Sequence, residues 1–303
     1  MRISTRLMFN KHGWRIDRTI HNYIYFRFYY PYVKTVNVLL PTLKYLNWFK
    51  PIVPIGKMIF NRYHSKVISA EDTKKIFSLN EDISNISENN KKIIPFKYAT
   101  KIIFQEPKYI AIMDCPCKKA SNTCTPVQSC IAVGRQIASF WLDHCKKYNA
   151  RKITQAEAVD IIKGFRKTGH ITQAFFKVAT GGSTGVICNC CPDCCVSLRA
   201  TKLALKIDSS LSMNAASGYS VLHDKEKCRE CAQCETVCNF GSIQFLKDTD
   251  SLNGKRVYNK NTCMGCELCV EECPEGALSI YTDFGKPLPL DLDMVKDMSV
   301  VTK

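Results

Sequence analysis

The sequence predicts an α+β protein with two cysteine-rich domains, and three observations support that prediction. The chain has 303 residues, 46% of them hydrophobic, which is enough for a buried core and for two or three domains. Its 18 cysteines fall into two regions, one of which repeats internally. The net charge of +16 is concentrated in the first 70 residues, where twelve Lys and Arg side chains accompany one acid, Asp17. We therefore expect a basic arm, a mostly helical cysteine-rich domain and a smaller C-terminal cysteine-rich domain.

The N-terminal arm, residues 1–68, is basic, rich in aromatic residues and interrupted by prolines. It cannot span a membrane, because no uncharged run in residues 1–70 exceeds nine residues and a spanning helix needs about 20. Three roles remain: a helical layer on the cysteine-rich domain with charges facing water or an acidic redox partner, peripheral contact with an anionic membrane surface, or nucleic-acid binding. No nucleic acid is expected as a partner, because the chain has no recognised binding module.

Residues 69–95 are expected to form a helix and a polar linker. Ser69 is placed to cap that helix, with Asp72 three residues further on. The stretch SLNEDISNISENNKK that follows is polar and is typical of an exposed loop.

Residues 96–205 are predicted to form a cysteine-rich metal-binding domain with two helices. One lies within residues 129–148, where apolar residues recur near helical spacing. The other begins at a capping box formed by Thr154 and Glu157 and ends near Gly169.

The first residues, MRISTRLMFNKHGWRIDRTI, lack the apolar stretch and the cleavage site of a secretory signal. A cytoplasmic location is therefore expected, with membrane association on the cytoplasmic face as an alternative. Thiols stay reduced in that compartment, so clustered cysteines are expected to bind metal rather than to form disulfides.

The last third of the chain contains an internal repeat with a constant offset of 35 residues. KCRECAQCETVCNFGSIQF (227–245) aligns with TCMGCELCVEECPEGALSI (262–280), and each copy contains C-x₂-C-x₂-C-x₃-C. A pair of zinc sites is the disfavoured alternative, because eight cysteines in a duplicated register are typical of iron–sulfur clusters. Residues 286–303 follow as a C-terminal tail.

This region, residues 215–285, resembles the bacterial-type dicluster ferredoxins. The resemblance implies a ferredoxin-like pseudo-twofold domain with two 4Fe–4S clusters. It also implies that the fourth cysteine of each copy binds the other copy's cluster. The implied ligands of one cluster are Cys228, Cys231, Cys234 and Cys273, and those of the other are Cys263, Cys266, Cys269 and Cys238. The sequence departs from the family pattern at Asn239, where the second copy has Pro274.

The middle cysteines form a further candidate metal site. They are Cys115, Cys117, Cys124, Cys130, Cys188, Cys190, Cys191, Cys194 and Cys195. We expect them to hold one or two additional iron–sulfur clusters, with zinc, spare thiols or a thiol redox site as alternatives. Cys145, His144 and His170 are interpreted as structural residues.

The function predicted from these motifs is electron transfer between redox protein partners in an anaerobic or microaerobic cell. No catalytic residues are predicted, because the sequence contains no Ser/His/Asp arrangement and no phosphate-binding loop. The alternatives are an iron–sulfur oxidoreductase or activating subunit with a catalytic centre at the middle cysteines, and a thiol redox sensor.

Overall fold

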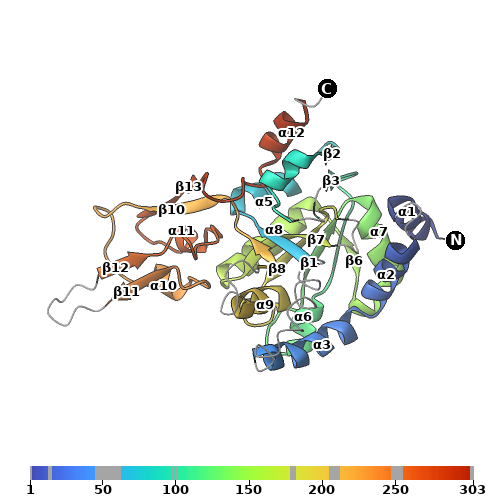
Figure 1. Cartoon of the computed structure of the whole chain (residues 1–303), viewed down its shortest axis with the longest axis horizontal. Helices are drawn as coiled ribbons and strands as arrows, with labels where there is room; N and C mark the ends of the chain where they lie inside the picture. The colour runs from blue at the N-terminus through green and yellow to red at the C-terminus, as the bar shows by residue number, and fades with distance from the viewer. Residues whose placement is uncertain are drawn as a thin grey trace.

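The computed structural model describes residues 2–12, 16–44, 63–96, 99, 101–177, 182–204, 212–246 and 255–300. Within them lie a group of N-terminal helices, a sheet covered on both faces and an elongated C-terminal domain that projects from the rest (Figure 1). Residues 45–62 of the predicted arm lie outside the described residues.

A seven-stranded sheet forms the middle of the molecule, in the strand order β6-β4-β5-β8-β7-β1-β9. Neighbouring strands are antiparallel except for the parallel pair β1 and β9. The strands are β1 Tyr63–Val67, β4 Ile110–Asp114, β5 Gln128–Val133, β6 Arg151–Ile153, β7 Ile171–Lys177, β8 Val186–Cys190 and β9 Asn214–Ala215.

The prediction of a mostly helical cysteine-rich domain is wrong for the described residues, because this sheet is its core. All five residues of β4 and of β8 are buried, so neither strand alternates between apolar and polar residues. A short run that is buried on both faces cannot be told from a helix by its periodicity. The helix predicted within residues 129–148 is instead β5 followed by α7 Arg135–His144, separated by Gly134 at φ 95°.

Each face of the sheet is covered by a separate hydrophobic core. One face contains most of the middle cysteines together with Phe26 and Trp141, and α7 packs on it. The opposite face packs against α5 Ala70–Phe77 and α8 Gln155–Lys167. That core also includes the two-stranded sheet of β2 Ile83–Ile86 and β3 Lys101–Phe104, and α12 Leu292–Val300. The remaining elements of this region are η2 Glu88–Lys92, α6 Pro116–Ser121, η3 Lys146–Tyr148 and α9 Val196–Ala204.

Both predicted helix caps are present. Ser69 Oγ accepts a hydrogen bond from the Asp72 N–H at 3.0 Å, and Thr154 Oγ1 accepts one from the Glu157 N–H at 3.1 Å. Local capping chemistry was readable because both partners lie within one turn of the same chain segment.

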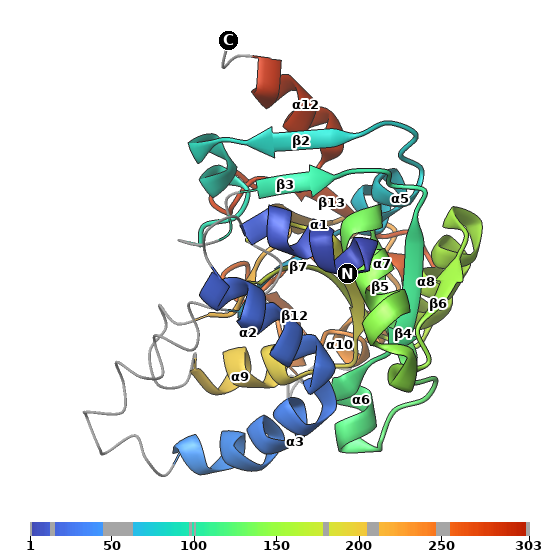
Figure 2. The same cartoon turned by 90° about the vertical axis from the view of Figure 1, so that its right-hand side faces the viewer.

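Three helices from the N-terminal arm lie along one side of the molecule: α1 Ile3–His12, α2 Ile16–Arg27 and α3 Tyr29–Leu39, followed by η1 Leu40–Lys44 (Figure 2). Tyr25, Phe26, Tyr29 and Val33 are buried against the cysteine face of the sheet. None of the described helices is long and apolar enough to cross a membrane.

The C-terminal domain shows the duplication in its backbone. β10 Tyr219–His223 pairs with β13 Leu278–Thr282, and β11 Ile243–Leu246 pairs with β12 Lys255–Tyr258. The short helices α10 Gln233–Thr236 and α11 Leu268–Glu271 stand at the repeat offset. These pairs form the two halves of a pseudo-twofold unit.

Candidate metal centres

The two cysteine loops of the C-terminal domain have matching backbone conformations. Glu230 and Ala232 have φ of 57° and 59°, and their counterparts at the repeat offset, Gly265 and Glu267, have φ of 62° and 71°. Three of these four positions are not glycine, so the left-handed conformation is adopted against its usual cost. Both loops therefore adopt a backbone conformation that their local sequence does not favour.

The thiols of this domain lie in two neighbouring groups. Cys228, Cys231, Cys234 and Cys273 line one cavity, which opens to solvent where Cys231 is exposed; we call these the outer set. Cys238, Cys263, Cys266 and Cys269 are electrostatic neighbours of one another in the domain interior; we call these the inner set. Each set thus combines three cysteines of one loop with the fourth cysteine of the other.

Backbone amides point at sulfur atoms of both sets. The Ser242 N–H donates to Cys238 Sγ at 3.2 Å, and the Ala277 N–H donates to Cys273 Sγ at 3.3 Å, again at the repeat offset. Such donors stabilise the thiolate form and are a known means of tuning cluster potential. The residues present therefore fit two 4Fe–4S clusters, with four converging thiols and amide donors at each.

A buried and a half-buried cation contact the inner set, and no sequence pattern predicts either of them. Arg166 is 4% exposed and donates to the Cys266 carbonyl at 2.8 Å, while its Nε lies 2.8 Å from Glu271 Oε1. Lys286 Nζ donates to the Cys263 carbonyl at 2.7 Å. Arg166 lies inside a regular helix and Lys286 in the predicted tail, so only the folded chain brings them to these carbonyls.

Six of the nine middle cysteines form a closed ring of neighbouring thiols. The ring runs through Cys115, Cys117, Cys195, Cys190, Cys188 and Cys130, and returns to Cys115. Within it, Cys188 Sγ lies 3.3 Å from Cys130 Sγ. Hydrogen bonds from neighbouring thiols hold the pKa of Cys115 and Cys195 well below the usual range. We refer to these residues as the six-thiol ring.

The other three middle cysteines meet beside the ring. The ligand atoms of Cys124, Cys191 and Cys194 lie within 4.8 Å of one another, and the Sγ atoms of Cys124 and Cys191 are 2.9 Å apart. Cys124 and Cys194 form a disulfide in this structure. Clustered cysteines are expected to bind metal rather than to pair; two of these three pair here, because the fold brings three sulfur atoms to one point from segments 70 residues apart.

The surroundings of the ring are apolar and aromatic, with one cation. A cavity of about 100 Å³ beside the ring is lined by Tyr29, Tyr32 and Phe175. Lys118 is 1% exposed; burial lowers its pKa, while nearby thiolates, first that of Cys115, oppose the shift. The ring is thus shielded from water, and Lys118 supplies a positive charge within reach of several thiols.

The residues interpreted as structural lie outside the ring. Cys145 is fully buried and donates to the Phe26 carbonyl at 3.9 Å, and burial raises its pKa to about 12. His144 Nε2 lies 3.2 Å from Thr5 Oγ1, where it helps to hold α1 against α7. Burial lowers the pKa of His170 to about 4.

A short polar chain connects the inner set with the six-thiol ring. Arg166, which donates to the Cys266 carbonyl, also reaches Thr172 Oγ1 at 3.5 Å. Thr172 Oγ1 in turn donates to Asn189 Oδ1 at 3.3 Å, and Asn189 lies between two ring cysteines on β8. Met264 and Cys266 also pack against the core that contains the ring. The inner set is therefore the one adjacent to the middle cysteines.

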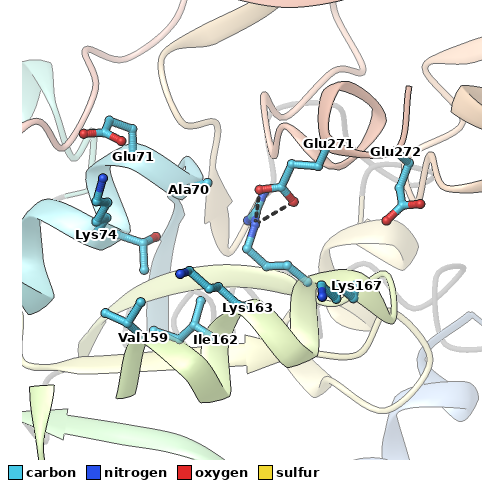
Figure 3. Close-up of a pocket in the computed structure, with 11 residues that line it drawn as sticks. Ala70, Glu71, Lys74, Val159, Ile162, Lys163, Lys167, Glu271 and Glu272 are labelled. Carbon is cyan, nitrogen blue, oxygen red and sulfur yellow. Dashed lines mark hydrogen bonds and ion pairs between the residues drawn. The ribbon is translucent and has the colours of Figure 1, made fainter. Parts of the chain in front are cut away.

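A cleft of about 380 Å³ opens where α5, α8 and α11 meet. Figure 3 shows the Arg166–Glu271 ion pair in its wall, with the side chains of Lys163 and Lys167 from α8 and Glu71 and Lys74 from α5 around it. Both acidic and basic side chains line the cleft, so it favours neither an anionic nor a cationic ligand.

Two sets of four thiols on a duplicated loop-and-helix unit define a dicluster iron–sulfur domain. The family model of the 4Fe–4S dicluster domain matches residues 227–277. An uncharacterized ferredoxin of Methanocaldococcus jannaschii is 36% identical over 61 residues, which are 20% of this chain and 75% of that ferredoxin. The chain belongs to the dicluster ferredoxin family through this C-terminal domain.

Two further relatives match the same part of the chain. Pyruvate synthase subunit PorD of Methanocaldococcus jannaschii is 36% identical over 56 residues, 18% of this chain and 59% of that subunit. The archaeal-type glutamate synthase (NADPH) of Thermotoga maritima is 36% identical over 63 residues, 20% of this chain and 11% of that enzyme. The chain thus spans only a small part of the synthase.

Proposed function

We propose that the protein transfers single electrons between redox protein partners, and that its middle cysteines hold at least one iron–sulfur cluster in addition to the two of the ferredoxin domain. The observation that supports this most is the six-thiol ring, which is buried and adjacent to the inner set. Two relatives are named as a ferredoxin and a subunit of a redox enzyme, which is consistent with an electron-transfer role.

The different solvent exposure of the cysteines supports different roles for the outer set, the inner set and the middle site. Bound clusters would supply the one-electron chemistry. The protein's residues would bury and orient the clusters and set the charge around them. Cys231 is exposed, so the outer set is the side on which a redox partner would dock. The ring cysteines are buried under α3, except for Cys117, which is half-buried, so the middle site would exchange electrons through the inner set rather than directly with solvent species.

For the middle site we propose the nine cysteines of the ring and of the Cys124–Cys191–Cys194 group as the ligand pool. In a metal-bound form Cys124 and Cys194 would be reduced, because metal ligation requires thiolates. Six ring thiols exceed the four that one cubane or one zinc ion uses. This excess favours more than one tetrathiolate site or a cluster with additional ligands.

A thiol redox site is a second candidate function, favoured by the disulfide between Cys124 and Cys194. Cys191, with its sulfur atom 2.9 Å from that of Cys124, is placed as an exchange partner. In this case the Cys124→Ser change would abolish an oxygen-dependent mass shift and leave the iron content unchanged.

The test is the anaerobic iron, sulfide and zinc content per chain, compared with a Cys190→Ser, Cys191→Ser variant and with Cys145→Ser as the control. We expect about twelve irons or more in the parent and about four fewer in the double variant, with no loss in the control. About eight irons in all three proteins would refute the additional cluster and leave the ferredoxin domain intact.

A further inference from the structure

Helix α2 presents apolar side chains to the solvent as well as to the core. Ile16, Ile20 and Ile24 on α2, and Phe28 directly after its end, follow one another at intervals of four residues and are 57%, 54%, 51% and 53% exposed. Residues spaced in this way lie on one side of a helix. The buried positions of the same helix are Thr19, Asn22, Tyr25 and Phe26, so the helix already has an apolar side in the core. The opposite side of a surface helix is normally polar, so a second, exposed apolar stripe marks a surface that a partner covers.

The neighbouring helices also expose large apolar side chains. Val38 and Leu39 at the end of α3 are 67% and 53% exposed, and Phe9 on α1 is 41% exposed. Figure 2 shows α1, α2 and α3 along the same side of the molecule. We call the exposed residues Phe9, Ile16, Ile20, Ile24, Phe28, Val38 and Leu39 the apolar ridge.

Positive charge accompanies the apolar ridge. Lys147 Nζ lies 5.3 Å from the centre of the Phe28 ring, and Arg27 is exposed next to it in the sequence. Arg6 and Lys34 are exposed on α1 and α3. Within the described part of the first 44 residues, Asp17 is the only acid. A helix face with large apolar side chains and flanking Lys and Arg is the chemistry that binds anionic lipid surfaces.

We propose that the apolar ridge docks on an anionic membrane surface, with α2 lying in the interface and the cations contacting lipid phosphates. An acidic protein would match the charge, but it would not account for four aliphatic and aromatic side chains presented on a convex helix rather than in a groove. The ferredoxin domain lies at the opposite end of the molecule from α1 to α3 (Figure 1). Docking would therefore leave the exposed Cys231 side free for a redox partner.

The test is co-sedimentation of the full chain with vesicles of phosphatidylcholine alone and of phosphatidylcholine containing about one-third phosphatidylglycerol. We expect binding to the anionic vesicles that weakens as salt rises from about 0.1 M to about 0.5 M, and much weaker binding to the neutral ones. An Ile20→Ser, Ile24→Ser variant should bind about tenfold or more weakly, because two side chains no longer enter the interface.

Two matched controls separate the ridge from general surface properties. Leu222→Ser, Phe284→Ser removes two exposed apolar side chains from the ferredoxin domain, and Lys163→Gln, Lys167→Gln removes two exposed charges at the cleft of Figure 3. Both should bind anionic vesicles as the parent does. The unchanged visible spectrum of every variant would show that the fold is retained, independently of the proposed function.

Equal binding of the parent and of the Ile20→Ser, Ile24→Ser variant would overturn the proposal, as would the absence of binding to anionic vesicles. A parent that is dimeric in solution, with a monomeric Ile20→Ser, Ile24→Ser variant that binds vesicles no more weakly, would assign the ridge to a second copy of the chain instead.

Discussion

Arg166 and Lys286 place positive charge next to the inner set of ferredoxin thiols. Both donate to carbonyls of cysteines in that set, and Arg166 is almost fully buried. A nearby cation stabilises the state that has gained an electron, because that state is the more negative one. The outer set has cations too, since Arg229 and Arg256 line its cavity, but Arg229 is exposed and Arg256 is half-buried. The two sets thus differ in how deeply their neighbouring cations are buried.

Replacing Arg166→Gln should lower the reduction potential of one of the two ferredoxin clusters. The change removes a buried positive charge and leaves Glu271 without its partner, so a decrease of about 50–100 mV is expected. An anaerobic redox titration followed by electron paramagnetic resonance measures it. Lys167→Gln, an exposed neighbour on α8, should leave both potentials unchanged. The same shift in both variants would show that the position of Arg166 is not special.

Lys66 offers a separate prediction about pH. Its Nζ is buried and donates to the Ala216 carbonyl at 2.8 Å; burial lowers its pKa from 10.5 to about 7, and Asp72 opposes this shift. Between about pH 7 and pH 10 the unfolded chain binds more protons at this residue than the folded protein does, so its contribution to stability rises with pH.

Replacing Lys66→Met should remove that pH dependence. The free energy of unfolding of the parent, relative to the variant, is expected to rise by about 2 kcal/mol between pH 7 and about pH 9. Anaerobic urea denaturation followed by circular dichroism at the two pH values measures the difference. Parallel changes in both proteins would mean that Lys66 stays charged in the fold.

At the scale of elements, α3 and β8 decide the surroundings of the six-thiol ring. β8 supplies Cys188 and Cys190 from one face of a fully buried strand, while α3 covers the site with Tyr29 and Val33. Burial raises the pKa of the Tyr29 hydroxyl well above its usual range, as expected for a phenol held away from water. The basic arm is thus part of the site's covering rather than a separate appendage.

Replacing Tyr29→Ala should open the middle site to solvent. The aromatic side chain of Tyr29 lines the cavity beside the cysteines of the six-thiol ring. Its loss therefore leaves a path for a chelator. We expect the proposed cluster of the middle site to release its iron to an anaerobic chelator severalfold faster, measured as loss of visible absorbance. Tyr23→Ala, on α2 and against Phe140 and His144, is the control and should release iron as the parent does.

At the scale of the whole molecule, exposure falls from the ferredoxin domain toward the sheet. Cys231 is exposed and Cys228 and Cys234 are half-buried, whereas most of the ring cysteines are buried. The inner set lies between them, joined to the sheet by the Arg166–Thr172–Asn189 contacts. The arrangement is linear, with an accessible end and an insulated end.

This gradient predicts the order in which iron is lost. With an anaerobic chelator, release should occur in at least two phases, the ferredoxin domain first and the middle site last, because access to the buried thiols requires local opening. The Cys190→Ser, Cys191→Ser variant should lack the slow phase and keep the fast one. A single phase in the parent that is unchanged in this variant would contradict the gradient.

Features that depend on a short segment of the chain could be predicted from the sequence, and features that depend on contacts between distant segments could not. The repeat at 35 residues, the family of the C-terminal domain and the caps at Ser69 and Thr154 follow from patterns within one short segment. The strands β4 and β8 were missed because a strand buried on both faces has no alternation to detect. The apolar ridge was also hidden, because a helical pattern does not say which of its sides faces the core.

The sequence by itself determined that this chain has a dicluster ferredoxin domain, an excess of cysteines in its middle and a basic arm. Only the tertiary structure decided how the middle cysteines group, which ferredoxin set lies next to them, and that Arg166 and Lys286 reach the inner set. The physical reason is that several of these contacts join segments that are 100 or more residues apart in the chain. Local spacing determines a motif, but the packing of the sheet and its helices determines which motifs meet.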